Sequence, residues 1–237
     1  YVYLASMCIS GVNTSFINNN APLSGGAIYV DSPFVYSASM CISGVNTIFR
    51  GNTAQRGGAI FSYNGNLTIN GNDTEFRGNS ANSDTMGGGG AIYNSGTITN
   101  ITGTRDSAGN LVAFKGNSVT STSNSSEHSG GGAIYNGGNI TNITGDFIEN
   151  TIKSIDQARG GAIINNKFKS DKGKIDTITG NFIRNGAITT ASDKPALGGA
   201  IYNDGTMTLN GATFTNNPAQ VNGGAIYNQG TATIENS

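Results

Sequence analysis

One short motif, Gly-Gly-Ala-Ile followed by tyrosine, phenylalanine or isoleucine, recurs seven times along the chain. A second motif, a phenylalanine followed three residues later by an asparagine, alternates with the first and also occurs seven times. The isoleucines of the first motif are Ile28, Ile60, Ile92, Ile134, Ile163, Ile201 and Ile226. The phenylalanines of the second are Phe16, Phe49, Phe76, Phe114, Phe147, Phe182 and Phe214, and its asparagines are Asn19, Asn52, Asn79, Asn117, Asn150, Asn185 and Asn217. This alternation indicates a repeat fold in which each unit packs against its neighbours.

Short segments of alternating apolar and polar side chains lie between the two motifs. Examples are Leu67-Thr68-Ile69, Met207-Thr208-Leu209 and Ala232-Thr233-Ile234. A period of two predicts strands, and the surrounding glycines and asparagines predict turns, so each repeat is expected to hold three short strands. A β-sandwich would not require the same residue at the same place in every unit, whereas coils stacked about 4.8 Å apart do. We predict an all-β fold, a right-handed single-stranded parallel β-helix (solenoid) of about seven three-strand coils.

The repeated isoleucines, phenylalanines and asparagines are expected to form vertical ladders through this stack. Unequal spacing between motifs predicts loops, the longest over residues 118–130. Because successive side chains of a strand point to opposite faces, the residue after each motif isoleucine should point outward. We expect these residues to make an exposed, largely aromatic contact stripe, with packing under loops as the alternative. The stripe consists of Tyr29, Phe61, Tyr93, Tyr135, Ile164, Tyr202 and Tyr227.

Residues 1–237 are expected to form a single β-helix domain, either a segment of a longer protein or an open-ended subunit that assembles. The first residues, 1–5, lack the basic region of a signal peptide, which favours a mature piece or an excised segment. Thirteen basic residues against fourteen acidic ones give a net charge of −1. No basic run suggests a nucleic-acid or anionic-membrane partner, and no apolar run is long enough for a membrane helix.

Two cysteines, Cys8 and Cys41, lie in a segment that is repeated, Met-Cys-Ile-Ser-Gly-Val-Asn-Thr. Both occupy the outward position held by Thr68 in the next repeat. Stacking would bring their Cα atoms to about 5 Å, within disulfide range. In-register strands orient the two side chains in parallel, which is poor disulfide geometry, so two free thiols are favoured over a bond. No other cysteine is present and the single histidine is distant in sequence, so no metal site is expected.

Candidate catalytic groups are sparse. Glu75 and Asp146 each directly precede a repeat phenylalanine, but they are two coils apart, with Ala113 in between, about 10 Å by the stacking distance. That separation is wide for a retaining glycosidase and marginal for an inverting one. His128 lies among serines in the longest loop, where a solvated histidine is expected rather than a catalytic one. We expect no catalytic residues, no cofactor and no enzymatic activity.

The paired Gly-Gly-Ala-Ile and Phe-x-x-Asn motifs resemble the repeats of the chlamydial polymorphic outer membrane proteins, and are also similar to repeats of other bacterial surface β-helices. The resemblance covers most of the chain, from Phe16 to Asn228. It implies an autotransporter-like passenger that acts in adhesion at the bacterial cell surface. The chain departs from the family in its two cysteines, because chlamydial members are typically cysteine-rich.

We therefore expect a non-enzymatic, extracellular adhesin whose partner is a host-cell or other surface receptor. The second hypothesis is a structural subunit of an extracellular filament, assembled from copies of the chain by end-to-end coil stacking, because unpaired strand edges readily pair with another copy. The third hypothesis is a polysaccharide-active β-helix enzyme.

Overall fold

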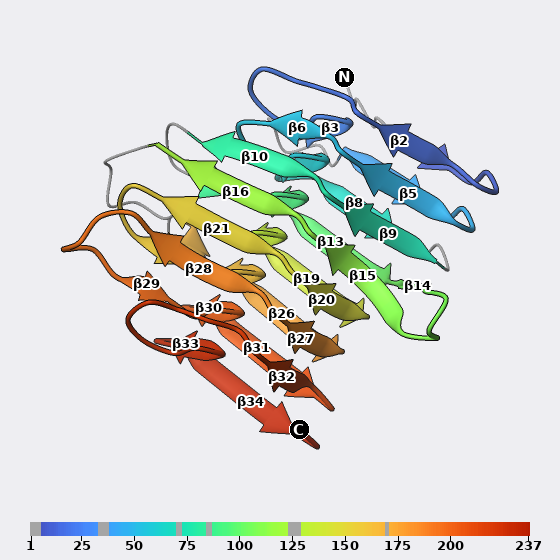
Figure 1. Ribbon diagram of the computed structural model, residues 1–237. Coiled ribbons are helices and arrows are strands. Elements are labelled where there is room, and N and C mark those ends of the chain that lie inside the picture. Colours follow the sequence, from blue (N-terminus) through green and yellow to red (C-terminus); the bar gives the residue numbers. More distant parts are fainter. Residues whose placement is uncertain (1–5, 33–37, 70–72, 84–86, 123–128, 169–170) are drawn as a thin grey trace.

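The computed structural model describes residues 6–32, 38–69, 73–83, 87–122, 129–168 and 171–237. These residues contain no helix, and their strands lie one above another in parallel ladders from the N-terminal to the C-terminal end (Figure 1). Only two short hairpin pairings, β14 with β15 and β24 with β25, are antiparallel among them. The predicted parallel β-helix is confirmed.

Three long sheets form the sides of the stack. The first sheet contains β1 (Ser6–Ile9), β4 (Ser39–Ile42), β8 (Asn66–Ile69), β13 (Thr97–Thr102), β19 (Asn139–Thr144), β26 (Lys174–Thr179), β31 (Thr206–Asn210) and β34 (Thr231–Glu235). The phenylalanine sheet contains β2 (Ser15–Ile17), β5 (Thr47–Arg50), β9 (Thr74–Arg77), β15 (Leu111–Lys115), β20 (Asp146–Ile148), β27 (Asn181–Ile183) and β32 (Thr213–Thr215), with β14 (Thr104–Arg105) paired to β15. The isoleucine sheet contains β3 (Ile28–Asp31), β7 (Ile60–Tyr63), β12 (Ile92–Asn94), β18 (Ile134–Asn136), β23 (Ile163–Asn165), β30 (Ile201–Asn203) and β33 (Ile226–Asn228).

Two further ladders lie between the phenylalanine and isoleucine sheets, so three strands per coil is too few. The five-stranded ladder contains β6 (Thr53–Ala54), β10 (Ser80–Ser83), β16 (Ser118–Ser121), β21 (Thr151–Ser154) and β28 (Gly186–Thr189). The four-stranded ladder contains β11 (Gly87–Gly88), β17 (Ser129–Gly130), β22 (Ala158–Arg159) and β29 (Ala196–Leu197). A hairpin of β24 (Lys167–Phe168) and β25 (Asp171–Lys172) is separate. The loop expected over 118–130 therefore begins and ends in strands.

The main core lies between the three long sheets. Neighbouring motif phenylalanines are paired in register, and their rings are stacked with centroids 4.7–5.0 Å apart. The motif isoleucines pair in the same way along the isoleucine sheet. This geometry removes the five central phenylalanine side chains from water. They are the largest of the fully buried side chains. Burial on this scale supplies the dominant stabilisation of the stack.

The asparagine of the second motif stabilises the corner after each phenylalanine strand. Its backbone N–H and its Nδ2 both donate to Oδ1 of the corresponding asparagine in the next coil, at 2.9–3.0 Å. From Asn52 onward, Nδ2 also donates to the carbonyl oxygen of the preceding coil's phenylalanine, at 2.8–3.0 Å. The amide thus satisfies backbone groups that would otherwise be buried without a partner.

The asparagine ladder expected from the sequence is not uniform along the stack. Its first member, Asn19, is exposed at the N-terminal end and donates only to Asn52, because no coil precedes it among the described residues. Asn185, near the other end, is fully buried and bonds to both neighbours, donating to Oδ1 of Asn217 and to the carbonyl oxygen of Phe147. Asn217 is the last member; it is 8% exposed and donates to the carbonyl oxygen of Phe182. The terminal members therefore stabilise the stack from one side only.

The two glycines of the first motif are required for different structural reasons, one for its backbone conformation and the other for lack of space. Gly89, the first, has φ +70°, which side chains rarely adopt. Gly90, the second, has no room for a side chain, because a Cβ there would lie 2.1 Å from the carbonyl oxygen of Gly132 and 2.5 Å from that of Ser118. Ser118 directly follows the ladder residue Asn117. The two sequence motifs therefore occur together because their backbones approach closely at this point.

The aromatic stripe points away from the main core, but its expected exposure is wrong for most of its members. Tyr93 and Tyr202 are each only 4% exposed, and the stripe belongs to a second apolar cluster that includes Leu197. The four-stranded ladder covers it, since a Cβ on Gly87 of β11 would lie 3.3 Å from the Tyr93 ring. Phe61, Tyr135 and Ile164 are buried in the same way. Tyr29, which is 55% exposed, is the exception, and Tyr227 is partly buried.

Candidate ligand-binding face

The outer side of the phenylalanine sheet presents the most distinctive surface chemistry of the described residues. Because side chains alternate along a strand, the residue after each buried phenylalanine points outward. Three of these residues are basic and adjacent, with Arg50 paired in register with Arg77, and Arg77 with Lys115. We call these three residues the basic ladder. The ring spacings of the underlying phenylalanines, 4.8 and 5.0 Å, set the spacing of its rungs.

The charges of the basic ladder are only partly compensated. Arg77 forms an ion pair with Glu75, at 2.8 Å between Nη2 and Oε1, and its Nε donates to the same oxygen. Arg50 and Lys115 form no ion pair within the part of the chain that the structure describes. Like charges directly opposite each other on neighbouring strands are destabilising. Glu75 lies between the charges of Arg50 and Lys115, and Lys115 also contributes to the lowered pKa of Asp106, so the face keeps a small excess of positive charge that an anionic ligand can neutralise.

A shallow groove lies on the same face, beside the basic ladder. It has a volume of about 210 Å³ and is lined by Asn13, Thr14, Ser15, Asn46, Ile48 and Thr104. Ile48 and Arg50 are alternate residues of β5 and both point outward, so the groove and the ladder share this strand. Nδ2 of Asn46 donates to Oδ1 of Asn13 at 3.0 Å, and Oγ1 of Thr104 is buried without a hydrogen-bond partner among the described residues.

The hairpin of β14 brings Thr104 to this groove. Asp106 organises the turn that follows, because its Oδ1 accepts hydrogen bonds from the backbone N–H groups of Ala108 and Asn110, both at 2.9 Å. The side-chain hydrogen bond from Asn110 is the main reason that the pKa of Asp106 is lowered. Arg105 Nη1 donates to the carbonyl oxygen of Gly109 across the same turn. The insertion is therefore a defined hairpin rather than an irregular loop.

The two carboxylates considered for catalysis are engaged separately. Glu75 is held by Arg77. Asp146 is buried, and its Oδ1 accepts hydrogen bonds from the backbone N–H and Nδ2 of Asn181, at 2.7 and 2.9 Å. Burial is the largest influence on the pKa of Asp146 and raises it, while the hydrogen bonds from Asn181 oppose that shift. A bulge at Ala113, opposite the step between Asp146 and Phe147, separates the two carboxylates along the sheet.

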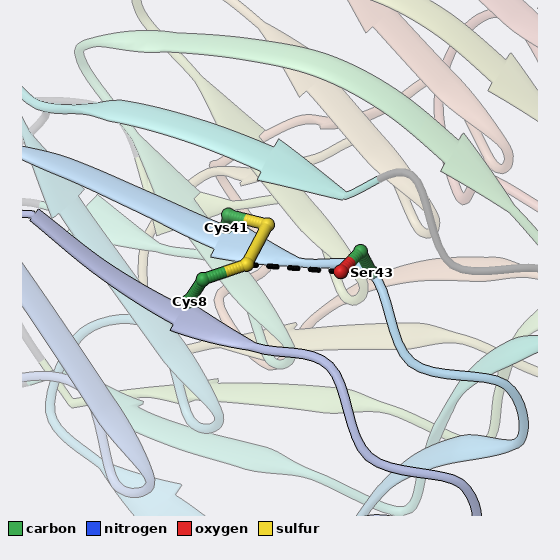
Figure 2. The surroundings of a disulfide bond; sticks show 3 residues. All are labelled: Cys8, Cys41 and Ser43. Atoms are coloured by element: carbon green, nitrogen blue, oxygen red, sulfur yellow. Dashed lines mark hydrogen bonds between the residues drawn. A yellow bond between two sulfur atoms is a disulfide. The ribbon is translucent and has the colours of Figure 1, made fainter.

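The remaining candidate residues lie elsewhere. Cys8 and Cys41 are joined by a disulfide bond between β1 and β4, with Cα atoms 4.4 Å apart (Figure 2). The prediction of two free thiols is therefore wrong. The in-register pairing of the two strands brings the cysteines directly opposite each other. Sγ of Cys8 also lies 3.7 Å from Oγ of Ser43. His128 lies outside the described residues. In the described part of the chain, no group of three or more metal-ligating side chains is present.

Neither the basic ladder nor a second asparagine ladder is among the predictions from the sequence. The basic ladder escapes a composition analysis because its members are scattered in sequence, but the signal is present as Phe-Arg, Phe-Arg and Phe-Lys in successive repeats. A second asparagine ladder runs along the isoleucine sheet, where Nδ2 donates to the next Oδ1 at 2.7–2.8 Å. Its members are Asn94, Asn136, Asn165, Asn203 and Asn228. The signal was an asparagine two residues after the motif isoleucine in five repeats.

A known family of repeats matches the segments that contain these motifs. The model of the Chlamydia polymorphic membrane protein repeat matches residues 13–31, 46–63, 73–95 and 211–229. The chain carries this repeat. Each matched segment of the polymorphic membrane protein repeat extends from about the second motif of one coil into the first motif that follows it. No curated protein and no solved structure was found to match the chain.

The repeat suggests a setting for the chain. Polymorphic membrane proteins of Chlamydia are outer membrane proteins, which suggests a location at the cell surface. Among the described residues, no helix is long and apolar enough to cross a membrane. The basic ladder lies in the coils of the second and third matched segments and in the coil that follows them.

Proposed function

We propose that this chain is a non-enzymatic, surface-exposed β-helix that acts in adhesion, binding a receptor on a host cell or another surface. The observation that carries the proposal is the open outer face of the phenylalanine sheet, where the groove, the β14 hairpin and the basic ladder are combined on a hydrogen-bonded scaffold. Binding faces positioned on a rigid scaffold lose little conformational entropy when a partner is bound. The polymorphic membrane protein repeat supports the same proposal.

The test is a cell-binding assay with purified protein. We expect saturable binding to host cells that is competed by excess unlabelled protein, while electron microscopy of the same sample shows single short rods. Absence of saturable binding at micromolar concentration contradicts the adhesin proposal. Long unbranched filaments in the same sample favour a structural subunit instead.

An enzymatic role is tested separately on the two carboxylates. We expect no release of reducing sugars from a panel of polysaccharides by the parent protein, because Glu75 is paired with Arg77 and Asp146 is bound by Asn181. Turnover that is lost in both Glu75→Gln and Asp146→Asn would overturn this part of the proposal. Binding without turnover agrees with it.

A further inference from the structure

The basic ladder and the groove point to one class of ligand, an inference that rests on the proposed adhesive function and extends it. We infer that the outer face of the phenylalanine sheet binds a sulfated polysaccharide. Sugar units would occupy the groove and sulfate groups would contact Arg50, Arg77 and Lys115. The shared strand β5, which contributes Ile48 to the groove and Arg50 to the ladder, connects the two parts of this site.

The spacing and chemistry of the ladder favour an extended anion. Its three cationic residues lie on three neighbouring strands along the axis of the stack, and the phenylalanines that precede them have ring centroids 4.8 and 5.0 Å apart. Arginine presents several N–H donors in a planar fork that suits oxyanions, so Arg77 retains donors for a sulfate while its Nε and Nη2 contact Glu75. A single small anion would contact one rung, whereas a chain that carries several sulfates can contact all three.

The chemistry of the groove favours a ligand in which the anionic groups are attached to a chain of sugar units. Its lining combines one apolar side chain, Ile48, with amide and hydroxyl groups that can exchange hydrogen bonds with sugar hydroxyls. Thr104 lines the groove, and its Oγ1, which has no hydrogen-bond partner among the described residues, would reach a sugar hydroxyl after rotation of the side chain. The volume of about 210 Å³ is below that of pockets that enclose a whole ligand, which fits a site that seats one part of a longer chain.

Other polyanions fit this face less well. Single-stranded nucleic acid is bound on aromatic stacking platforms, and the outward positions that continue the ladder hold Ile17, Ile148, Ile183 and Thr215. Recognition of an anionic membrane uses clusters of about four to eight basic residues, more than this face provides.

The direct test uses a heparin-derived hexasaccharide and its unsulfated backbone, measured by calorimetry at two salt concentrations. We expect binding of the sulfated form only, at least tenfold weaker in the double variant Arg50→Gln/Lys115→Gln, with a shallower salt dependence. The matched control is Lys153→Gln/Lys174→Gln, which removes the same charge from two other ladders and should leave affinity within twofold. Thr104→Val should weaken binding without changing the salt dependence.

Several results would overturn the inference. These are equal loss in the control variant, equal binding of the unsulfated backbone, and tighter binding of single-stranded DNA or of phosphatidylserine vesicles than of the hexasaccharide. A parallel cell-binding measurement separates this inference from the proposed function. If the double variant binds cells as well as the parent does, the polysaccharide inference fails while the adhesive function remains. If no protein binds cells but the hexasaccharide is bound, the adhesive function fails instead.

Discussion

A ladder asparagine such as Asn117 satisfies four polar groups at once. Its Nδ2 donates to Oδ1 of Asn150 and to the carbonyl oxygen of Phe76, and its Oδ1 accepts from the N–H and Nδ2 of Asn79. All of these atoms are buried. The side chain is therefore a structural connector between three successive coils, and no residue of similar size reproduces both its donor and its acceptor.

The first prediction concerns this connector. Asn117→Ala should lower the free energy of unfolding by about 2–4 kcal/mol, because buried donors and acceptors on Asn79, Asn150 and Phe76 lose their partner. Asn142→Ala is the matched control, since Asn142 is exposed and its Nδ2 donates to Oδ1 of Asn100, which is partly exposed to solvent on the outer side of the first sheet. Urea unfolding of both variants measures the difference. Equal values for the two would show that the ladder bonds contribute little.

Backbone conformation gives a second prediction at the same scale. The residue before each ladder asparagine has φ between 53 and 65°, and it is glycine, asparagine, glutamate or arginine in different coils. Gly116 has open space around its Cβ position. Gly116→Ala should therefore cost about 1 kcal/mol through backbone strain alone, and Gly116→Asn should cost less, because Asn18 and Asn216 occupy equivalent positions. Thermal unfolding compares the two; a larger loss in Gly116→Asn would contradict this explanation.

At the scale of elements, the four-stranded ladder turns an expected surface stripe into a second core. Burial is the main reason that the pKa values of Tyr93, Tyr135 and Tyr202 are raised. The guanidinium of Arg159 lies 5.1 Å from the centre of the Tyr202 ring, and that of Arg56 lies 5.2 Å from the centre of the Phe61 ring. These cations cover part of the stripe from outside and stabilise it by cation–π interaction.

This burial predicts a loss of stability at high pH. An unfolded tyrosine ionises near pH 10, whereas the folded stripe keeps its protons, so stability is complete below pH 10 and falls as the pH rises above it. Between pH 7 and pH 11, the free energy of unfolding should fall by about 1 kcal/mol less in Tyr93→Phe than in the parent, because the variant has no phenol to ionise at this position. Phenylalanine already occupies this register at Phe61. Guanidinium unfolding at both pH values measures the effect.

The largely exposed Tyr29 is the control for that measurement. Tyr29→Phe should change the pH dependence less than Tyr93→Phe, because solvent reaches Tyr29 and the phenolate formed there is better hydrated. The reverse order would show that the stripe is accessible to water in solution.

The three long sheets were predictable because two of them repeat the same inward residue in coil after coil, and the first alternates apolar and polar residues. The additional ladders were not, because each strand contributes only one or two apolar residues, such as Ala81, Val119, Ile152 and Ala187. A single small apolar residue next to serine or threonine gives no periodicity to detect. These segments are paired in register through backbone hydrogen bonds, which any residue except proline can make.

The candidate site shows the same limit. Outward positions carry no constraint from the core, so their identity changes from coil to coil, and Arg50, Arg77 and Lys115 become a group only once the register is known. The groove depends in addition on the β14 hairpin, whose insertion at one coil brings Thr104 beside residues of the first two coils. Sequence spacing alone does not place an insertion over a particular neighbour.

At the scale of the whole molecule, each coil contacts only its neighbours, which predicts modular behaviour. Deletion of residues 118–150 joins Asn117 to Thr151, the residue that pairs with Ser118 in the next coil, and so removes one complete coil. The shortened protein should fold with unchanged β-type circular dichroism and a smaller urea m-value, because less surface is exposed on unfolding. Deletion of residues 118–133 removes part of a coil and should abolish cooperative unfolding. If both variants fold cooperatively, the claim that only whole coils can be removed is wrong.

The hydrogen bonds of both asparagine ladders run between coils, parallel to the axis of the stack, and so do the backbone bonds of every long sheet. A mechanical load applied to the two ends of the chain therefore breaks the hydrogen bonds of one coil at a time, and does not load the hydrogen bonds of many coils at once. Asn117 and its ladder partner Asn150 are 33 residues apart. Releasing such a coil would add a contour length of about 110 Å, at about 3.3–3.6 Å per residue. Under tension, this protein would lengthen as a series of discrete steps, each absorbing work while the rest of the rod remains folded.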